Sequence, residues 1–263
     1  MAQKLYTTPA TRPIQDPSGT ANGLSHYTSM RSWVEQTEAG KGEIFIYEDF
    51  AKGFNCAQRK ASDETKTAGN SFNVADWKVI AIGAHTEAGG IAVQNVHNNG
   101  RITVTTNATD DDYVHLAYFN DICQPSRPWS YEIEVAIADQ VEADFAVGVM
   151  SDTVLVSANA TTAANGVYFQ RVEAAAFSCV TRTGGSAHDL TVSSVTPVNN
   201  LYNTLGIDYD GVGTVKFYID GAVVATHTGF TAAQPTRPAM EITACSAAIA
   251  TAKVNHIAFY QSM

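Results

Sequence analysis

The chain has 263 residues, of which 45% are hydrophobic and only 16% are charged, and its formal net charge is −10. This length suffices for one large domain with a buried core. The acidic balance and the absence of any run of Lys and Arg exclude a nucleic-acid partner, because binding phosphates requires clustered cations. No apolar stretch approaches the ~18 residues of a membrane span, so we expect no membrane partner.

Residues 1–42 are predicted to form an extended N-terminal arm. The segment carries Pro9, Pro13 and Pro17 among many Thr, Ser, Gln and Gly residues, which is typical of a segment without a core of its own. Ser29–Gly40 indicates one short helix with a serine cap and a glycine stop. The arm has no apolar region of the kind found in secretory signal peptides, so we expect no signal peptide. A flexible tail is the alternative to an arm that orders on a partner.

From residue 43 to residue 263 the pattern is that of β-structure. Apolar and polar residues alternate with the two-residue period of strands that bury one face, whereas residues 51–75 are polar and predict irregular structure. The expected strands are 43–50, 77–82, 91–96, 101–105, 114–119, 129–138, 144–150, 166–171, 176–182, 190–195, the three runs of the hairpin stretch 205–227, 239–245 and 254–260. Many short strands with regular turns predict an all-β, two-sheet antiparallel sandwich of the jelly-roll kind.

Leu205–His227 shows this pattern most clearly. Its apolar positions alternate with polar ones, and Asp220-Gly221 predicts a tight hairpin turn because this pair tolerates a positive φ. Asp208 and Asp210 fall on the polar face. We expect that face to be solvated and to carry no chemistry.

Glu132 and Glu134 are the strongest candidates for catalytic residues. They share one face of the predicted strand 129–138, and jelly-roll glucanases use alternating acids of this kind, about 5 Å apart, as nucleophile and acid. The glucanase pattern resembles Glu-x-Asp-x-x-Glu or has a third acid at i+4, whereas this chain has Ala136 and Ile137 there. We therefore predict that both glutamates face outward from a half-buried strand and are not catalytic.

The candidates for metal ligands are equally weak. Asp110–Asp112 offers three carboxylates, but calcium needs six to eight converging oxygens, so the segment predicts an exposed acidic turn. Cys56, Cys123, Cys179 and Cys245 lie far apart without a C-x-x-C pair, which excludes a recognisable zinc site and favours free, partly buried thiols, with a disulfide as the alternative that no spacing supports. The histidines lie singly and are expected in surface or satisfied positions.

Motifs for nucleotide binding and hydrolysis are absent from the sequence. It contains no G-x-x-x-x-G-K-[ST], no H-E-x-x-H and no G-x-S-x-G, each of which is fairly specific. The sequence therefore predicts a protein that is not an enzyme, with no catalytic residue, no cofactor and no metal ligand.

Seven segments, taken in order, resemble a known family. They are Tyr47–Phe50 (YEDF), Asp76–Val79 (DWKV), Asn107–Asp112 (NATDDD), Pro128–Val135 (PWSYEIEV), Asp144–Val149 (DFAVGV), Asn165–Phe169 (NGVYF) and Val215–Gly221 (VKFYIDG). This order is similar to that of the concanavalin A-like, laminin-G-like structural proteins of tailed-phage virions. The resemblance covers residues 45–263.

The resemblance implies a non-enzymatic virion protein, made in the host cytoplasm and placed on the capsid surface. Its implied role is that of a bacteriophage decoration or cement protein that contacts the major capsid protein through the N-terminal arm and the sandwich surface. A homo-oligomer is expected, and a trimer would suit threefold positions on the shell. The alternative is a receptor-recognition or tail-associated module of a virion that binds a host glycan.

Overall fold

The structure is a computed structural model, and every regular element in its described residues is a β-strand. The described residues are 44–48, 70–74, 77–82, 94–97, 101–106, 108–109, 112–118, 120–138, 143–151, 165–231, 235–245 and 248–261. Within these ranges no helix is long and apolar enough to cross a lipid bilayer. The predicted arm, residues 1–42, and its short helix lie outside the described residues.

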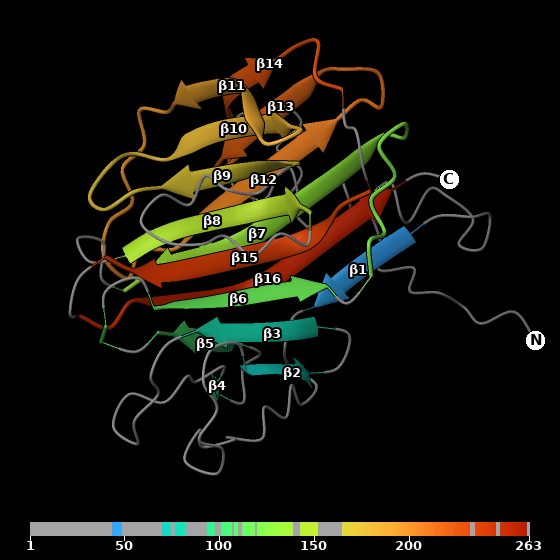
Figure 1. Cartoon of the computed structure of the whole chain (residues 1–263). Helices are drawn as coiled ribbons and strands as arrows, with labels where there is room; N and C mark the ends of the chain where they lie inside the picture. Colours follow the sequence, from blue (N-terminus) through green and yellow to red (C-terminus); the bar gives the residue numbers. More distant parts are fainter. Residues whose placement is uncertain are drawn as a thin grey trace, which may run out of the picture.

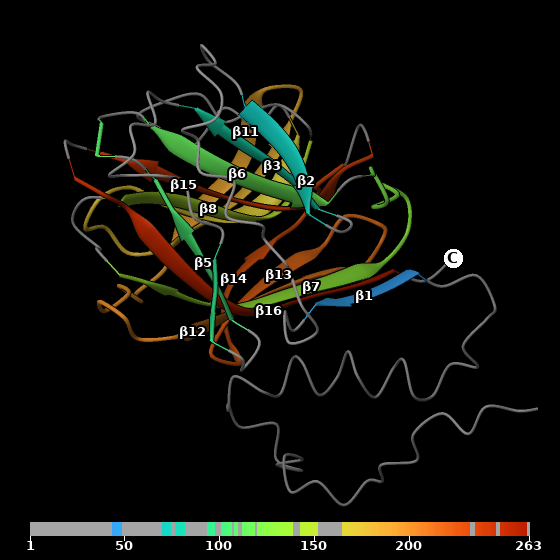
Figure 2. The same cartoon turned by 90° about the horizontal axis from the view of Figure 1, so that it is seen from below.

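The described strands form two sheets, sheet A and sheet B, of eight strands each (Figures 1 and 2). In sheet order, sheet A consists of β14 (Ala222–His227), β13 (Val215–Ile219), β12 (Asn203–Tyr209), β7 (Trp129–Ile137), β16 (Thr251–Gln261), β5 (Arg101–Thr105) and β4 (Gln94–His97), with β1 (Ile44–Glu48) paired to β16. Sheet B consists of β11 (Ser186–Val192), β10 (Ser178–Thr183), β9 (Gly166–Arg171), β8 (Ala143–Met150), β15 (Arg237–Ala244), β6 (Tyr113–Tyr118), β3 (Trp77–Ile82) and β2 (Asn70–Val74). Every pairing is antiparallel, which confirms the predicted two-sheet sandwich.

The core lies between the two sheets, where alternate residues of each strand meet. On β7 the inward side chains are Tyr131, Ile133 and Val135, all buried. Phe169 of sheet B and Phe217 of sheet A meet edge to face, with ring centroids 5.3 Å apart. Burial of each large apolar side chain contributes about 1.5–3 kcal/mol, so this layer holds the sheets together.

The predicted strand bounds agree well with the structure, with two exceptions. The expected strands 77–82, 101–105 and 166–171 have the observed limits. The prediction that residues 51–75 are irregular is wrong for Asn70–Val74, which forms the edge strand β2. This strand, NSFNV, is mostly polar and carries little alternation, and its strand conformation depends on pairing with β3. β11 begins at Ser186, four residues before the expected start at Leu190.

A close approach of β8 and β9 depends on Gly148. A Cβ at this position would lie 2.4 Å from the Val167 carbonyl oxygen and 2.6 Å from the Tyr168 Cα. Both atoms belong to the backbone of the neighbouring strand, so neither can move without disturbing the pairing. Only glycine fits here, and the requirement is steric as well as conformational, because φ is +155°.

We predict that Gly148→Ala destabilises the protein by about 2–3 kcal/mol, because overpacking against backbone cannot relax by side-chain rotation. Urea unfolding followed by circular dichroism measures the change. Gly184→Ala is the matched control: its φ is also positive, +61°, but nothing lies within 4 Å of the added Cβ. Equal losses for the two variants would contradict the steric explanation.

Candidate binding site on the outer face of sheet A

The outer face of sheet A carries a row of polar side chains across three neighbouring strands. Ser130 of β7 lies opposite Asp208 of β12, and Asp208 lies opposite Lys216 of β13. The alternation that turns Tyr131 and Ile207 into the core turns these three side chains outward. The register of the sheet therefore brings together residues that are up to 86 positions apart in the sequence.

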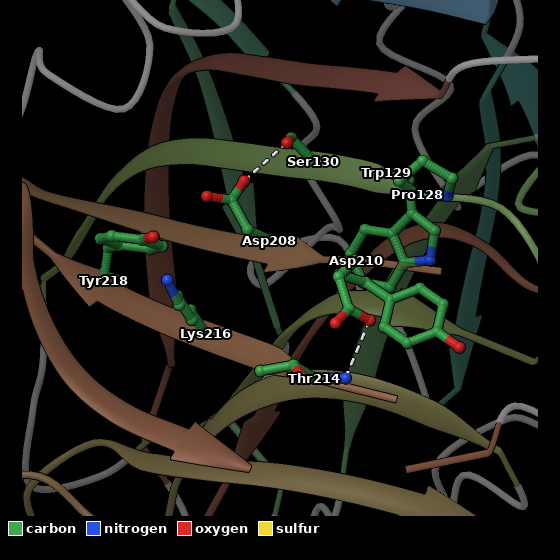
Figure 3. A pocket seen from close by; sticks show the side chains of 9 residues that line it. Pro128, Trp129, Ser130, Asp208, Asp210, Thr214, Lys216 and Tyr218 are labelled. Carbon is green, nitrogen blue, oxygen red and sulfur yellow. Dashed lines mark hydrogen bonds between the residues drawn. The ribbon is translucent and has the colours of Figure 1, made fainter. Parts of the chain in front are cut away.

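These side chains line a hollow of about 370 Å³ (Figure 3). Its lining residues are Pro128, Trp129, Ser130, Asp208, Tyr209, Asp210, Thr214, Lys216 and Tyr218. The Ser130 hydroxyl donates a hydrogen bond of 2.6 Å to Asp208 Oδ1. Burial raises the pKa of the Tyr218 phenol, and the charge of Asp208 and a hydrogen bond to it raise this pKa further. The Tyr218 hydroxyl therefore stays protonated and remains a donor.

One rim of the hollow is the turn that joins β12 to β13. Asp210 Oδ1 accepts hydrogen bonds of 2.8, 2.8 and 2.9 Å from the backbone N–H groups of residues 212–214. Slight burial alone would raise the pKa of Asp210, but these hydrogen bonds outweigh it and lower the pKa to about 2. Gly211 packs against Pro128, where a Cβ would lie 2.8 Å from the proline nitrogen. The rim is thus fixed in shape.

Glu132 and Glu134 lie on the same outer face but are not among the residues that line the hollow. Glu132 has no exposed surface, and its Oε1 lies 3.0 Å from His256 Nε2. His256 Nδ1 lies 3.7 Å from Glu134 Oε2, which also accepts a hydrogen bond from Asn255. The prediction that both glutamates point away from the core is confirmed. The prediction that they are ordinary solvated acids is wrong for Glu132, which His256 pairs and buries.

A β-bulge in β16 makes this arrangement possible. Val254 pairs with Val135 and His256 with Glu134, so two residues of β16 occupy the space opposite one residue of β7. Val254 and Ile257 both face the core, and the two residues between them both reach the glutamates. The sequence signal is the spacing of three between apolar residues at 254 and 257, where the strand period requires two.

His256 supplies the positive charge that both acids contact. Burial alone would lower the pKa of this imidazole, but hydrogen bonds to Glu132 and Glu134 and their negative charges raise it to about 9. With its pKa raised, His256 is protonated at neutral pH and lies between the two carboxyl groups within sheet A. Removing His256 from this set leaves two carboxylates without a counter-charge, one of them buried, which costs about 3–5 kcal/mol.

Two further predictions, for the acidic turn at Asp110–Asp112 and for the histidines, have different outcomes. Asp112 is buried, with 6% of its surface exposed, so the exposed acidic turn is wrong for this residue; Asp110 and Asp111 lie outside the described residues. His115 Nδ1 lies 3.3 Å from Glu241 Oε2 across β6 and β15, which agrees with a satisfied histidine.

The thiols fit the sequence prediction where they are described. Cys123 and Cys179 are free and buried, and Cys245 is free and half-buried, whereas Cys56 lies outside the described residues. Burial raises the pKa of Cys123 and Cys179 to about 12, so both stay protonated and unreactive. In the described part of the chain no group of three or more His, Cys, Asp or Glu residues could hold a metal ion.

Several solved structures are similar to this one. A β-glucanase of Bacillus licheniformis matches with a TM-score of 0.51 at 13% identity, over 84% of this chain and 98% of the glucanase. A protein of unknown function from Shewanella oneidensis MR-1, SO2946, matches with a TM-score of 0.52 at 9% identity, over 89% of this chain and 93% of its own. The Emp46p carbohydrate recognition domain in its metal-free form gives a TM-score of 0.48 at 11% identity, over 70% of this chain and 88% of the Emp46p domain.

No protein-family model matches the chain, and no curated protein matches it by sequence. At the identities above, the structural likeness establishes the fold alone, an all-β jelly-roll sandwich of the concanavalin A-like kind. One fold thus includes a glucanase, so fold by itself does not decide between hydrolysis and binding. The geometry of the acids and of the hollow has to decide.

We predict that the free energy of unfolding falls as the pH rises from 6.5 to 9. The folded state raises the pKa of His256 from 6.5 to about 9, so its stabilisation is complete below pH 6.5 and is lost as the pH rises through 9. The loss is about 3 kcal/mol. Urea unfolding at a series of pH values measures it. Glu132→Gln should lower the stability at pH 6 and flatten the slope, and an unchanged slope in this variant would contradict the assignment to His256.

Proposed function

We propose that the protein binds carbohydrate at the hollow on the outer face of sheet A and does not hydrolyse it. The observation that carries the proposal is the composition of the hollow. A carboxylate, a hydroxyl, a phenol and an ammonium group from Asp208, Ser130, Tyr218 and Lys216 converge there from three strands (Figure 3).

The chemistry of the hollow suits a sugar. Asp208 provides carboxylate oxygens that accept hydrogen bonds from sugar hydroxyls, while Lys216 supplies an ammonium donor; the Tyr218 hydroxyl already donates to Asp208. The volume of about 370 Å³ lies at the small end of ligand pockets, which suits one or two sugar rings. A protein of the same fold from Bacillus licheniformis is named a β-glucanase, which supports a saccharide as the ligand class here.

The arrangement of the acids argues against hydrolysis. A retaining glycosidase needs two carboxyl groups about 5 Å apart on either side of an accessible glycosidic bond. In this protein the imidazolium of His256 contacts both carboxylates, and Glu132 is fully buried. A substrate at the hollow would meet Asp208, not these acids. In this proposal Glu132 and Glu134 stabilise sheet A, and the hollow binds the carbohydrate.

The virion role stays a prediction beside this proposal. Attachment to a major capsid protein through residues 1–42, placement on the capsid surface and synthesis in a host cytoplasm all depend on the resemblance in the sequence. Carbohydrate binding is compatible with the receptor-recognition alternative, in which the ligand is a host glycan. Its site would then be the hollow rather than the arm.

We predict binding to at least one member of a panel of neutral oligosaccharides that includes β-glucan fragments, measured by isothermal titration calorimetry. Asp208→Asn and Lys216→Ala should each weaken binding by about tenfold, because each removes a charge-assisted hydrogen bond. Lys253→Ala is the matched control: this lysine lies on the same face, outside the hollow, and donates to Asn200.

The same samples are assayed for new reducing ends. No release is expected from any saccharide. Release by the wild type that disappears in Glu132→Gln would establish a hydrolase and overturn the proposal. Absence of binding across the panel, or equal binding by wild type and both hollow variants, would also overturn it.

A further inference from the structure

β11 ends sheet B, and among the described residues no strand pairs with its outer side. It lies at the same edge of the sandwich as β14, the last strand of sheet A (Figure 1). Open edges present unpaired backbone groups, and proteins usually guard them with Pro or Lys. Ser186–Val192, the sequence SAHDLTV, contains neither, and Asp189 is its only formally charged residue.

The exposed side of β11 is apolar. Leu190 is 48% exposed and Val192 is 61% exposed, and both side chains lie on the outer face of sheet B, since the intervening Thr191 pairs with the core residue Cys179. Large exposed aliphatic side chains on an unguarded edge strand favour association.

The backbone of β11 offers free hydrogen-bond donors and acceptors at Leu190 and Val192, the two residues with exposed aliphatic side chains. The Ser193 N–H donates to the Phe177 carbonyl at 2.8 Å, on the inner side of the strand. Backbone groups of an antiparallel strand alternate between its two sides. The backbone N–H and C=O groups of Thr191 therefore point toward β10, like the N–H of Ser193. The N–H and C=O groups of Leu190 and Val192 point the other way, toward the open edge of the sheet.

The edge is held in place from within the sandwich. The Thr191 hydroxyl lies 3.1 Å from His227 Nε2, and the Thr181 hydroxyl lies 3.2 Å from His227 Nδ1. His227 belongs to β14, so one buried imidazole ties β10 and β11 to the edge of the other sheet. A strand fixed in this way loses little conformational entropy when it pairs.

We propose that β11 pairs antiparallel with β11 of a second copy of this chain, about a twofold axis at Thr191. In this register Leu190 lies opposite Val192 of the second copy, and the pair occurs twice. Each pair exchanges both backbone hydrogen bonds, and its two aliphatic side chains pack together on one face. The occupant is a second copy because the strand is self-complementary.

Charge supports this register. Asp189 falls opposite position 193 of the second copy, a serine, and four positions separate it from the Asp189 that would repel it. The contact uses the same strand on both copies, so it closes as a dimer. A trimer, the oligomer that would suit threefold positions on a shell, would need a different surface.

Sedimentation velocity of the full chain across a wide concentration series tests the proposal. We expect a monomer–dimer equilibrium in the wild type, and Leu190→Lys and Val192→Glu should each raise the dissociation constant by about tenfold or more. Val212→Lys, at an 89% exposed turn residue away from β11, and Val223→Lys, at a 55% exposed residue of β14, should leave it unchanged. Circular dichroism checks that each variant keeps the wild-type melting temperature.

Mixing the two β11 variants tests the register. In the mixed dimer the new lysine at 190 faces the new glutamate at 192, and the other pair keeps its Leu–Val contact, so mixing should restore association. A wild type that stays monomeric at every concentration would overturn the proposal. A dimer that survives both β11 substitutions, or that Val223→Lys disrupts, would overturn it in favour of another surface.

Discussion

The buried ion pair between β7 and β16 is the constraint on which sheet A depends. Two carboxylates lie on adjacent outward positions of β7, and one has no exposed surface. Burying an unpaired carboxylate is too costly for a folded domain to tolerate. The imidazolium of His256 supplies a positive charge against both carboxylates, 3.0 Å from Glu132 and 3.7 Å from Glu134, and the bulge in β16 places it there. β16 also pairs with β1 and β5, so the same residue stabilises the strand on which half of the sheet assembles.

This constraint also separates two functions that share a fold. Adjacent acids on the face of a jelly-roll sheet are the arrangement that glycoside hydrolysis uses. A cation between them turns a catalytic pair into a structural one, because neither acid is then free to donate a proton or to attack. The neighbouring hollow keeps polar groups that face solvent, held by the hydrogen bond from Ser130 to Asp208 and by the fixed turn at Asp210. The proposal of binding without hydrolysis rests on this division.

Much of the fold was predictable from the sequence, because the two-residue period is a local signal. It predicted β7, β12 and β13, their inward faces and the turn at Asp220, whose φ of +50° precedes a glycine at +81°. It missed β2, a polar edge strand whose conformation depends on β3. The contacts of Glu132 were not predictable, because His256 is 124 positions away and only the register of the sheet brings them together. The spacing of Val254 and Ile257 in the sequence indicates the bulge, but it does not show which residues the side chains at the bulge contact.

The most direct test of this account is the protonation state of His256, measured by NMR titration of the histidine ring nitrogens, with His256→Gln to assign the signal. We expect an imidazolium at pH 7, protonated on both nitrogens, that titrates with a pKa of about 9. A neutral ring at pH 7 would contradict it. Two carboxylates without that cation beside them would no longer be compensated, and one would have to hold a proton, which is the acid and base pairing that hydrolysis requires.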